Sequence, residues 1–171
     1  MATRSTIALE FADGTIGQVY CHWDGYLAHN GKMLQEYYYN PFILRDLIDL
    51  GSLSSLRPTI GTKHPFSQFD YNQAVKMTTE EVKKHAEDFN AMYGDMCTFY
   101  GRDRGETNTE AKYFKDYEDF KANCQQEEYD YILRNVNGKA TWFVSDHGGD
   151  FQLLASALIE EILENVEVLP L

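Results

Sequence analysis

Hydrophobic and polar residues alternate over the first 23 positions of the chain. Ile7, Leu9 and Phe11 share one face of an extended segment, and Asp13-Gly14 follows with the signal of a tight turn. The alternation resumes from Thr15 to Trp23, with apolar residues on both faces. The pattern predicts a β-hairpin whose second strand is covered, at least in part, on both sides.

Helical spacing dominates the middle of the chain. It runs from Asn30 to Tyr39 and, after a capping asparagine and a first-turn proline, from Asn40 to Leu50. Thr78 and Glu81 have the spacing of a capping box. The helix that they begin is expected to bury one apolar stripe: Val82, Ala86, Phe89 and Met92. We interpret residues 52–77 as an ordered loop.

Strand patterns return in the last third. Residues 97–100 indicate a short strand before a Gly-flanked loop, and residues 116–123 a short helix. Residues 129–134 and 140–145 form a predicted hairpin joined by an Asn-Gly turn, and residues 151–154 one further strand.

An amphipathic helix is predicted from Ala155 to Asn165. We expect Leu158, Ile159 and Ile162 to face the core. The acidic positions are expected on the outside: Glu160, Glu161 and Glu164.

The order of these elements defines the fold class. The 171 residues suit one domain of ordinary size, and the chain has neither an internal repeat nor a dividing linker. The sequence therefore predicts a single α+β domain over residues 1–171, mainly an antiparallel sheet with helices packed on it.

The chain is strongly acidic, with 27 Asp and Glu against 15 Lys and Arg and a net charge of −12. An acidic surface repels phosphate backbones and anionic lipids, so we expect no direct binding to nucleic acid or membranes. The same charge suits a protein that occupies a basic surface on a partner. Aromatic residues, at 14%, suit partner surfaces and ligand pockets as well as cores.

The opening residues lead directly into a strand pattern rather than into a secretory signal, and the apolar runs are too short to span a bilayer. Three cysteines (Cys21, Cys97 and Cys124) are widely spaced without a CxxC pair. This spacing indicates neither a disulfide framework nor a zinc site. We therefore expect a cytoplasmic protein with reduced thiols.

The first candidate site is the string around His22, Trp23, Asp24 and Tyr26, at the end of the second predicted strand. On a continuing strand His22 and Asp24 would share a face, and a carboxylate beside an imidazole makes a general base. The structural alternative is a turn capped by Asp24, with Gly25 supplying a positive φ.

The second candidate site contains Arg102, Asp103 and Arg104 between two glycines. The guanidinium groups of two arginines present paired N–H donors, and in an acidic chain they indicate an anion site, such as one for a nucleotide. The alternative is that both arginines pair with neighbouring carboxylates.

A third segment, from Asp146 to Asp150, contains two carboxylates and His147. These ligands are too few for a metal site, and a tight polar turn is favoured. The chain also lacks a P-loop, a GxGxxG fingerprint, a GxSxG elbow and an HExxH motif. We expect no metal and no cofactor.

Four strings carry a resemblance: Met1–Ala8, Tyr20–Tyr26, His29–Gly31 and Thr98–Glu106. They resemble small accessory proteins of tailed bacteriophages and prophages, and the likeness covers most of the chain, most weakly over residues 60–95. It implies a phage gene product in the bacterial cytoplasm, of a kind that blunts host defences or redirects host machinery. It carries over no catalytic residue.

Three functions follow as hypotheses. The first is a binding protein that inhibits or modulates a host protein through its acidic surface. The second is a protein that sequesters a host signalling nucleotide, with the two arginines on phosphate and an aromatic ring of the 22–26 turn on the base. The third is a small enzyme acting on a nucleotide or peptide through His22 and Asp24. The sequence leaves open homo-oligomerisation and whether the two candidate sites meet.

Overall fold

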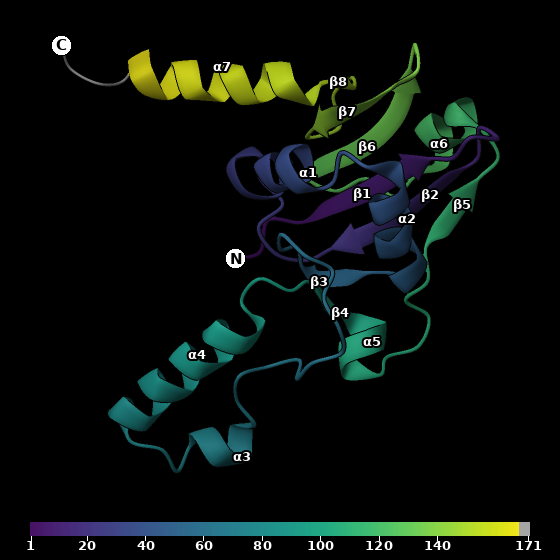
Figure 1. Ribbon diagram of the computed structural model, residues 1–171. Helices are drawn as coiled ribbons and strands as arrows, with labels where there is room; N and C mark the ends of the chain where they lie inside the picture. Colours follow the sequence, from purple (N-terminus) through teal and green to yellow (C-terminus); the bar gives the residue numbers. More distant parts are fainter. Residues whose placement is uncertain (168–171) are drawn as a thin grey trace.

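The computed structural model describes residues 1–167 (Figure 1). Its centre is one eight-stranded sheet in the order β4-β3-β2-β1-β6-β7-β8, with β5 paired to β2. The strands are β1 (Ser5–Glu10), β2 (Ile16–Cys21), β3 (Leu53–Ser55), β4 (Thr98–Phe99), β5 (Lys112–Phe114), β6 (Tyr129–Val136), β7 (Lys139–Asp146) and β8 (Gln152–Leu153). The helices are a π-helical turn, η1 (Leu27–Gly31), then α1 (Lys32–Tyr37), α2 (Pro41–Leu50), α3 (Tyr71–Ala74), α4 (Thr79–Tyr93), α5 (Tyr100–Arg104), α6 (Tyr117–Asn123) and α7 (Leu154–Glu167).

Both predicted hairpins are confirmed: β1 pairs with β2, and β6 with β7, each antiparallel. The α+β class is confirmed as well, but the sheet is mixed. β1 pairs in parallel with β6, from Ser5 opposite Tyr129 to Leu9 opposite Leu133. β2 pairs in parallel with β3. β1 therefore joins its own hairpin to the second one through its pairing with β6.

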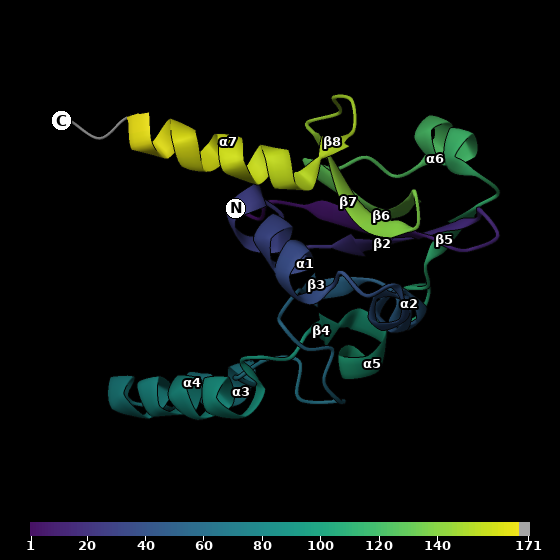
Figure 2. The same ribbon diagram turned by 45° about the horizontal axis from the view of Figure 1, so that its top comes forward.

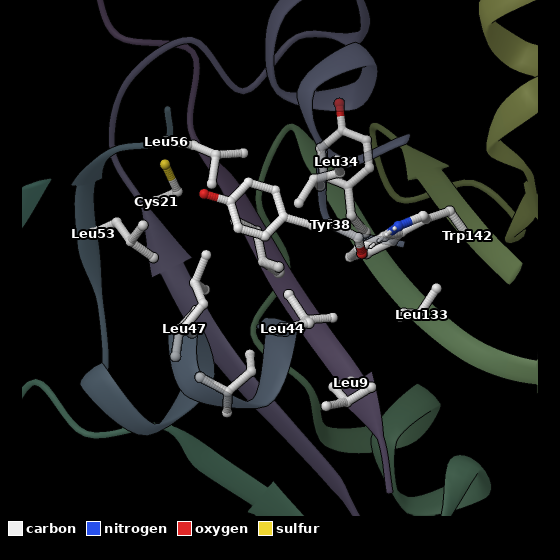
Figure 3. Close-up of a cluster of buried hydrophobic side chains, with 14 of the residues drawn as sticks. Leu9, Cys21, Leu34, Tyr38, Leu44, Leu47, Leu53, Leu56, Leu133 and Trp142 are labelled. Carbon is white, nitrogen blue, oxygen red and sulfur yellow. Dashed lines mark hydrogen bonds between the residues drawn. The ribbon is translucent and has the colours of Figure 1, made fainter. Parts of the chain in front are cut away.

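The larger core lies where α1, α2 and the segment between them cover the sheet (Figure 2). In Figure 3, Tyr38 and Leu44 from the helical side meet Leu9 and Leu133 from the strands. The indole nitrogen of Trp142 donates to the Tyr38 carbonyl oxygen at 3.1 Å. Burying such a side chain stabilises the fold by about 2 kcal/mol, so this layer holds the helices on the sheet.

The opposite face of the sheet is divided into an apolar part and a polar part. The apolar part is a small cluster closed by α6 and β5: Ala8, Ile16, Phe114, Phe120 and Ile132. Next to it, the strand registers place a row of polar residues across four strands: Tyr20, Thr6, Asp130 and Ser145. This polar row positions the pocket described below.

α4 extends away from the sheet (Figure 1). It begins at the predicted capping box, in which Thr78 and Glu81 bond each other's backbone amides. Over its described length α4 buries no side chain completely, and Met92, expected on the inner face, is exposed. The loop expected over residues 52–77 is interrupted by β3 and α3.

α7 leaves the sheet on the same side of the molecule as α4 (Figure 1, Figure 2). Its first turns bury Leu154 and Ala157 in the larger core. The expected burial of Ile159 and Ile162 is wrong, because both side chains are exposed. The helix continues past the sheet, so its later turns have no sheet beneath them.

Candidate functional site

The 22–26 turn begins where β2 ends. The Gly25 amide donates to the Thr3 carbonyl oxygen at 2.8 Å. A Cβ atom on Gly25 would lie 2.7 Å from that of Ser5, so this position requires glycine for space. The positive φ, 58°, belongs to Asp24 and not to Gly25 as expected.

The imidazole of His22 has a different partner from the one the sequence suggested. Its Nδ1 shares a 2.7 Å hydrogen bond with the hydroxyl of Tyr20, and its ring meets the Trp23 ring edge-on at 4.7 Å. Among the contacts of the described residues, His22 has no hydrogen bond with Asp24, because the chain turns out of the strand between them. Trp23 and Tyr26 are 45% and 40% exposed, so both rings can reach a partner.

The predicted loop of the second candidate site is a short helix, α5. Arg102 faces inward, and its guanidinium donates to Asp103 in a bidentate pair, with distances of 3.0 and 3.1 Å. The same group donates to the carbonyl oxygens of Ile60, Gly61 and Cys97 at 2.9–3.1 Å. Every nitrogen of Arg102 is therefore engaged within the protein.

Asp103 is the buried centre of this network. Besides Arg102, its carboxylate accepts from the amides of Phe99 and His64, at 2.8 and 3.1 Å. Arg104 differs: its guanidinium lies 4.9 Å from the Phe66 ring centroid and 3.7 Å from Glu106, with more than half of the side chain exposed. Of the two arginines, Arg104 is the one that can contact a ligand without breaking the fold.

The two candidate sites lie on either side of β3. The Trp23 amide bonds the Ser54 carbonyl oxygen, and the Tyr100 amide bonds that of Ser52. Trp23 and α5 therefore lie at opposite ends of this short strand. Burial raises the pKa of the nearby phenols of Tyr20 and Tyr100, so both remain neutral near neutral pH.

The 146–150 loop is a polar turn, as the sequence favoured. His147 has a positive φ of 50°, and its Nδ1 bonds the Asp146 carboxylate. That hydrogen bond raises the pKa of His147. Within residues 1–167, no three His, Cys, Asp or Glu side chains gather in a way that could hold a metal ion.

Sequence reasoning missed a pocket of about 370 Å³ between α6 and this loop. Tyr117 of α6 and Phe151 form walls, and Asp130 of β6 and Ser145 of β7 lie opposite each other in the sheet at its base. Burial raises the pKa of Asp130 to about 6, although hydrogen bonds from Thr6 and from a backbone amide oppose the shift. The available signal was a carboxylate at an inward-facing position of a strand.

Another cavity, of about 570 Å³, lies between the β1–β2 turn and the start of α2. Leu9, Pro41 and Leu133 give it apolar walls. Its charged groups, Glu10 and Arg134, pair with each other at 3.0 Å. The cavity offers apolar surface rather than reactive groups.

Comparison with protein-family models, curated proteins and solved structures found no match. In the part of the chain that the structure describes, no helix has the length and apolarity that crossing a bilayer requires. The functional argument therefore depends on surfaces and contacts.

Proposed function

We propose that this chain is a phage accessory protein that binds a bacterial host protein in the cytoplasm and inhibits or modulates it. The phage context comes from the resemblance of the four sequence strings. The observation that supports binding is an uncovered apolar surface on an acidic helix, α7.

The outer turns of α7 carry four exposed apolar residues: Ile159, Ile162, Leu163 and Val166, which we call the α7 stripe. Their side chains are 58%, 62%, 55% and 57% exposed. Residues at spacings of three, four and seven lie on one side of a helix. Large apolar side chains grouped in this way are typical of a helix that packs against a partner.

The charges of α7 favour a partner of a particular kind. The helix contains four glutamates and no lysine or arginine. Glu160 and Glu164 lie one turn apart beside the stripe. A second copy of α7 would bring glutamates against glutamates, whereas a surface with an apolar strip flanked by Lys or Arg would match both features. We therefore assign the α7 stripe to a host protein with an apolar, basic surface.

The nucleotide hypothesis is the alternative. Arg104, Trp23 and Tyr26 are exposed and available for it. Arg102 is engaged by five hydrogen bonds within the protein, so a phosphate could reach it only by displacing them. Binding of a host protein through the α7 stripe is supported better, because that surface can bind without any rearrangement of the fold.

The test is native mass spectrometry of the tagged chain recovered from host lysate, followed by titration of the purified partner against it. Ile159→Asp with Ile162→Asp should abolish the complex. Glu160→Lys with Glu164→Lys should weaken it and reduce its salt dependence. The matched control, Glu87→Lys with Glu110→Lys, makes the same charge change on exposed residues away from α7 and should leave binding unchanged.

Two results would overturn this assignment. One is a partner that both α7 variants retain with wild-type affinity. The other is a concentration-dependent dimer that the Ile159→Asp, Ile162→Asp variant abolishes, which would make the α7 stripe a self-association surface. Circular dichroism checks each variant, and the substituted side chains are exposed, so the fold should be unaffected.

A further inference from the structure

The pocket between α6 and the 146–150 loop has chemistry that the proposed function does not use. It is open at the surface, and its volume of about 370 Å³ is in the range of small-molecule sites. The walls come from Tyr117 and Phe151, whose ring centroids are 6.4 Å apart. Two paired strands and a helix supply the base and one wall, and the 146–150 loop with Phe151 supplies the other side.

The base of the pocket presents acceptors. Oδ1 of Asp130 accepts from the Thr6 hydroxyl at 2.6 Å and from the Glu127 amide at 3.1 Å. Within residues 1–167, Oδ2 has only a long contact with that same amide, at 3.3 Å, and so retains accepting capacity. Ser145 uses its hydrogen to bond the Gly149 carbonyl oxygen at 2.6 Å, which leaves its oxygen as an acceptor. A ligand that reaches this base must donate hydrogen bonds.

The charges around the pocket favour a cation. Asp150 lies at the rim and adds a second carboxylate. Lys121 also borders the pocket, but its ammonium is 3.1 Å from Glu118 and 4.8 Å from the centroid of the Tyr117 ring. The Arg134 guanidinium lies 3.6 Å from the same centroid, so both basic side chains are held against the Tyr117 ring, and the ligand's ammonium is left to the carboxylates.

We propose that this pocket binds a small organic cation, a primary ammonium joined to an aromatic or flat apolar group. The ammonium donates to Asp130 Oδ2 and to Ser145 Oγ, and the rim carboxylate of Asp150 adds attraction. The apolar part lies against the edges of the Tyr117 and Phe151 rings, which line the pocket.

The buried carboxylate gives this site a pH signature. Burial raises the pKa of Asp130 to about 6, and the bound ammonium favours the ionised form. Glu127 and the Cys124 thiol face Asp130, and Lys121 and Asp150 border the same pocket. Burial raises the pKa of the Cys124 thiol, so the thiol stays neutral. Binding should therefore release a proton at pH values below the Asp130 pKa, and affinity should fall about tenfold per pH unit there.

Isothermal titration calorimetry with three matched probes tests the proposal. Tyramine is the ammonium, 4-ethylphenol the neutral analogue and 3-(4-hydroxyphenyl)propionate the anion. We expect saturable binding of tyramine alone at neutral pH. Titrations in buffers of different ionisation enthalpy, one pH unit below the Asp130 pKa, should show proton release on binding.

Two substitutions and a control locate the site. Asp130→Asn should weaken tyramine binding about tenfold or more and remove the proton release. Asp150→Asn changes an exposed rim residue, keeps the fold and should weaken binding several-fold. Asp13→Asn, an exposed acid at the distant β1–β2 turn, should have no effect.

The proposal is overturned if tyramine fails to bind with a Kd below about 10 mM, or if the three probes bind alike. It is also overturned if Asp150→Asn and a folded Asp130→Asn both bind tyramine normally. These results concern a pocket separate from α7, so they leave the α7 stripe assignment intact.

Discussion

Arg102 and Arg104 lie two residues apart on α5 and differ in what surrounds them. The Arg102 side chain is 12% exposed, and the Asp103 carboxylate that it pairs with is fully buried. Its remaining hydrogens bond three backbone carbonyl oxygens from two other segments. Arg102 therefore links residues 60–61 and 97 to α5, while Arg104 lies at the surface against Phe66 and Glu106.

This difference predicts unequal effects of the same substitution. Arg102→Ala leaves a buried carboxylate without its cation and should lower the free energy of unfolding by about 3 kcal/mol. Arg104→Ala removes an exposed contact and should cost no more than about 0.5 kcal/mol. Urea denaturation monitored by tryptophan fluorescence measures both. Equal losses in the two variants would contradict the network described for Arg102.

At the scale of elements, α2 and α4 have similar beginnings and different surroundings. The Asn40 side chain accepts from the Phe42 amide at 2.9 Å, and the Thr78 side chain accepts from the Glu81 amide at 3.2 Å. α2 buries Leu44, Leu47 and Ile48 in the core, whereas α4 over its described length buries none of its residues. The same kind of cap therefore stabilises a core element in one case and a peripheral helix in the other.

Removing each cap should separate these roles. Asn40→Ala should lower the global free energy of unfolding by about 1 kcal/mol, since α2 unfolds with the core. Thr78→Ala should leave the global value unchanged and speed hydrogen exchange of the α4 amides, because that helix can open locally. Denaturant titration and hydrogen-exchange mass spectrometry distinguish the two. A global loss in Thr78→Ala would show that α4 is coupled to the core more tightly than its contacts indicate.

Local signals explain how much of the fold could be predicted from the sequence. Both hairpins follow from alternation and a Gly-containing turn, and α2 and α4 follow from their caps, all encoded within a few residues. The parallel pairing of β1 with β6 joins segments far apart in the chain and has no local signal. The exposure of Ile159 has a similar cause: periodicity gives an apolar face but not what covers it.

The candidate site shows the same limit. The sequence pointed to the 22–26 turn and to residues 102–104. It could not show that Tyr20 forms a hydrogen bond with His22, or that the Arg102 guanidinium is paired with Asp103. The sequence gives no sign of a role for Asp130, because that role depends on strand register and on α6 above it. The sequence shows which residues carry charged or reactive groups, but it does not show which residues surround them in the folded structure.

At the scale of the whole molecule, the net charge of −12 opposes compactness, because like charges repel across the surface. Screening this repulsion should raise stability. We expect sodium chloride, from low to moderate ionic strength, to raise the thermal midpoint by roughly 3 °C, equivalent to about 1 kcal/mol.

Differential scanning calorimetry tests this expectation with a charge-reduced variant. Asp46→Lys, Glu87→Lys and Glu110→Lys change three exposed acids, each by two charges, and bring the net charge from −12 to −6. The salt response should shrink in this variant. A midpoint independent of salt in the wild type, or an unchanged response in the variant, would contradict the argument.

The central position of β1 has a consequence for synthesis on the ribosome. Thr6 and Asp130, neighbours in the sheet, are 124 positions apart, so the middle strand is translated long before its parallel partner. The β1–β2 hairpin of the nascent chain keeps an unpaired strand edge until β6 leaves the exit tunnel of the ribosome. Pairing between segments so far apart in the sequence favours slow folding. A chain that stops before β6 keeps that edge, ready to pair with other chains. Premature termination should therefore be more damaging than most substitutions, since it leaves an aggregation-prone fragment rather than a weakened protein.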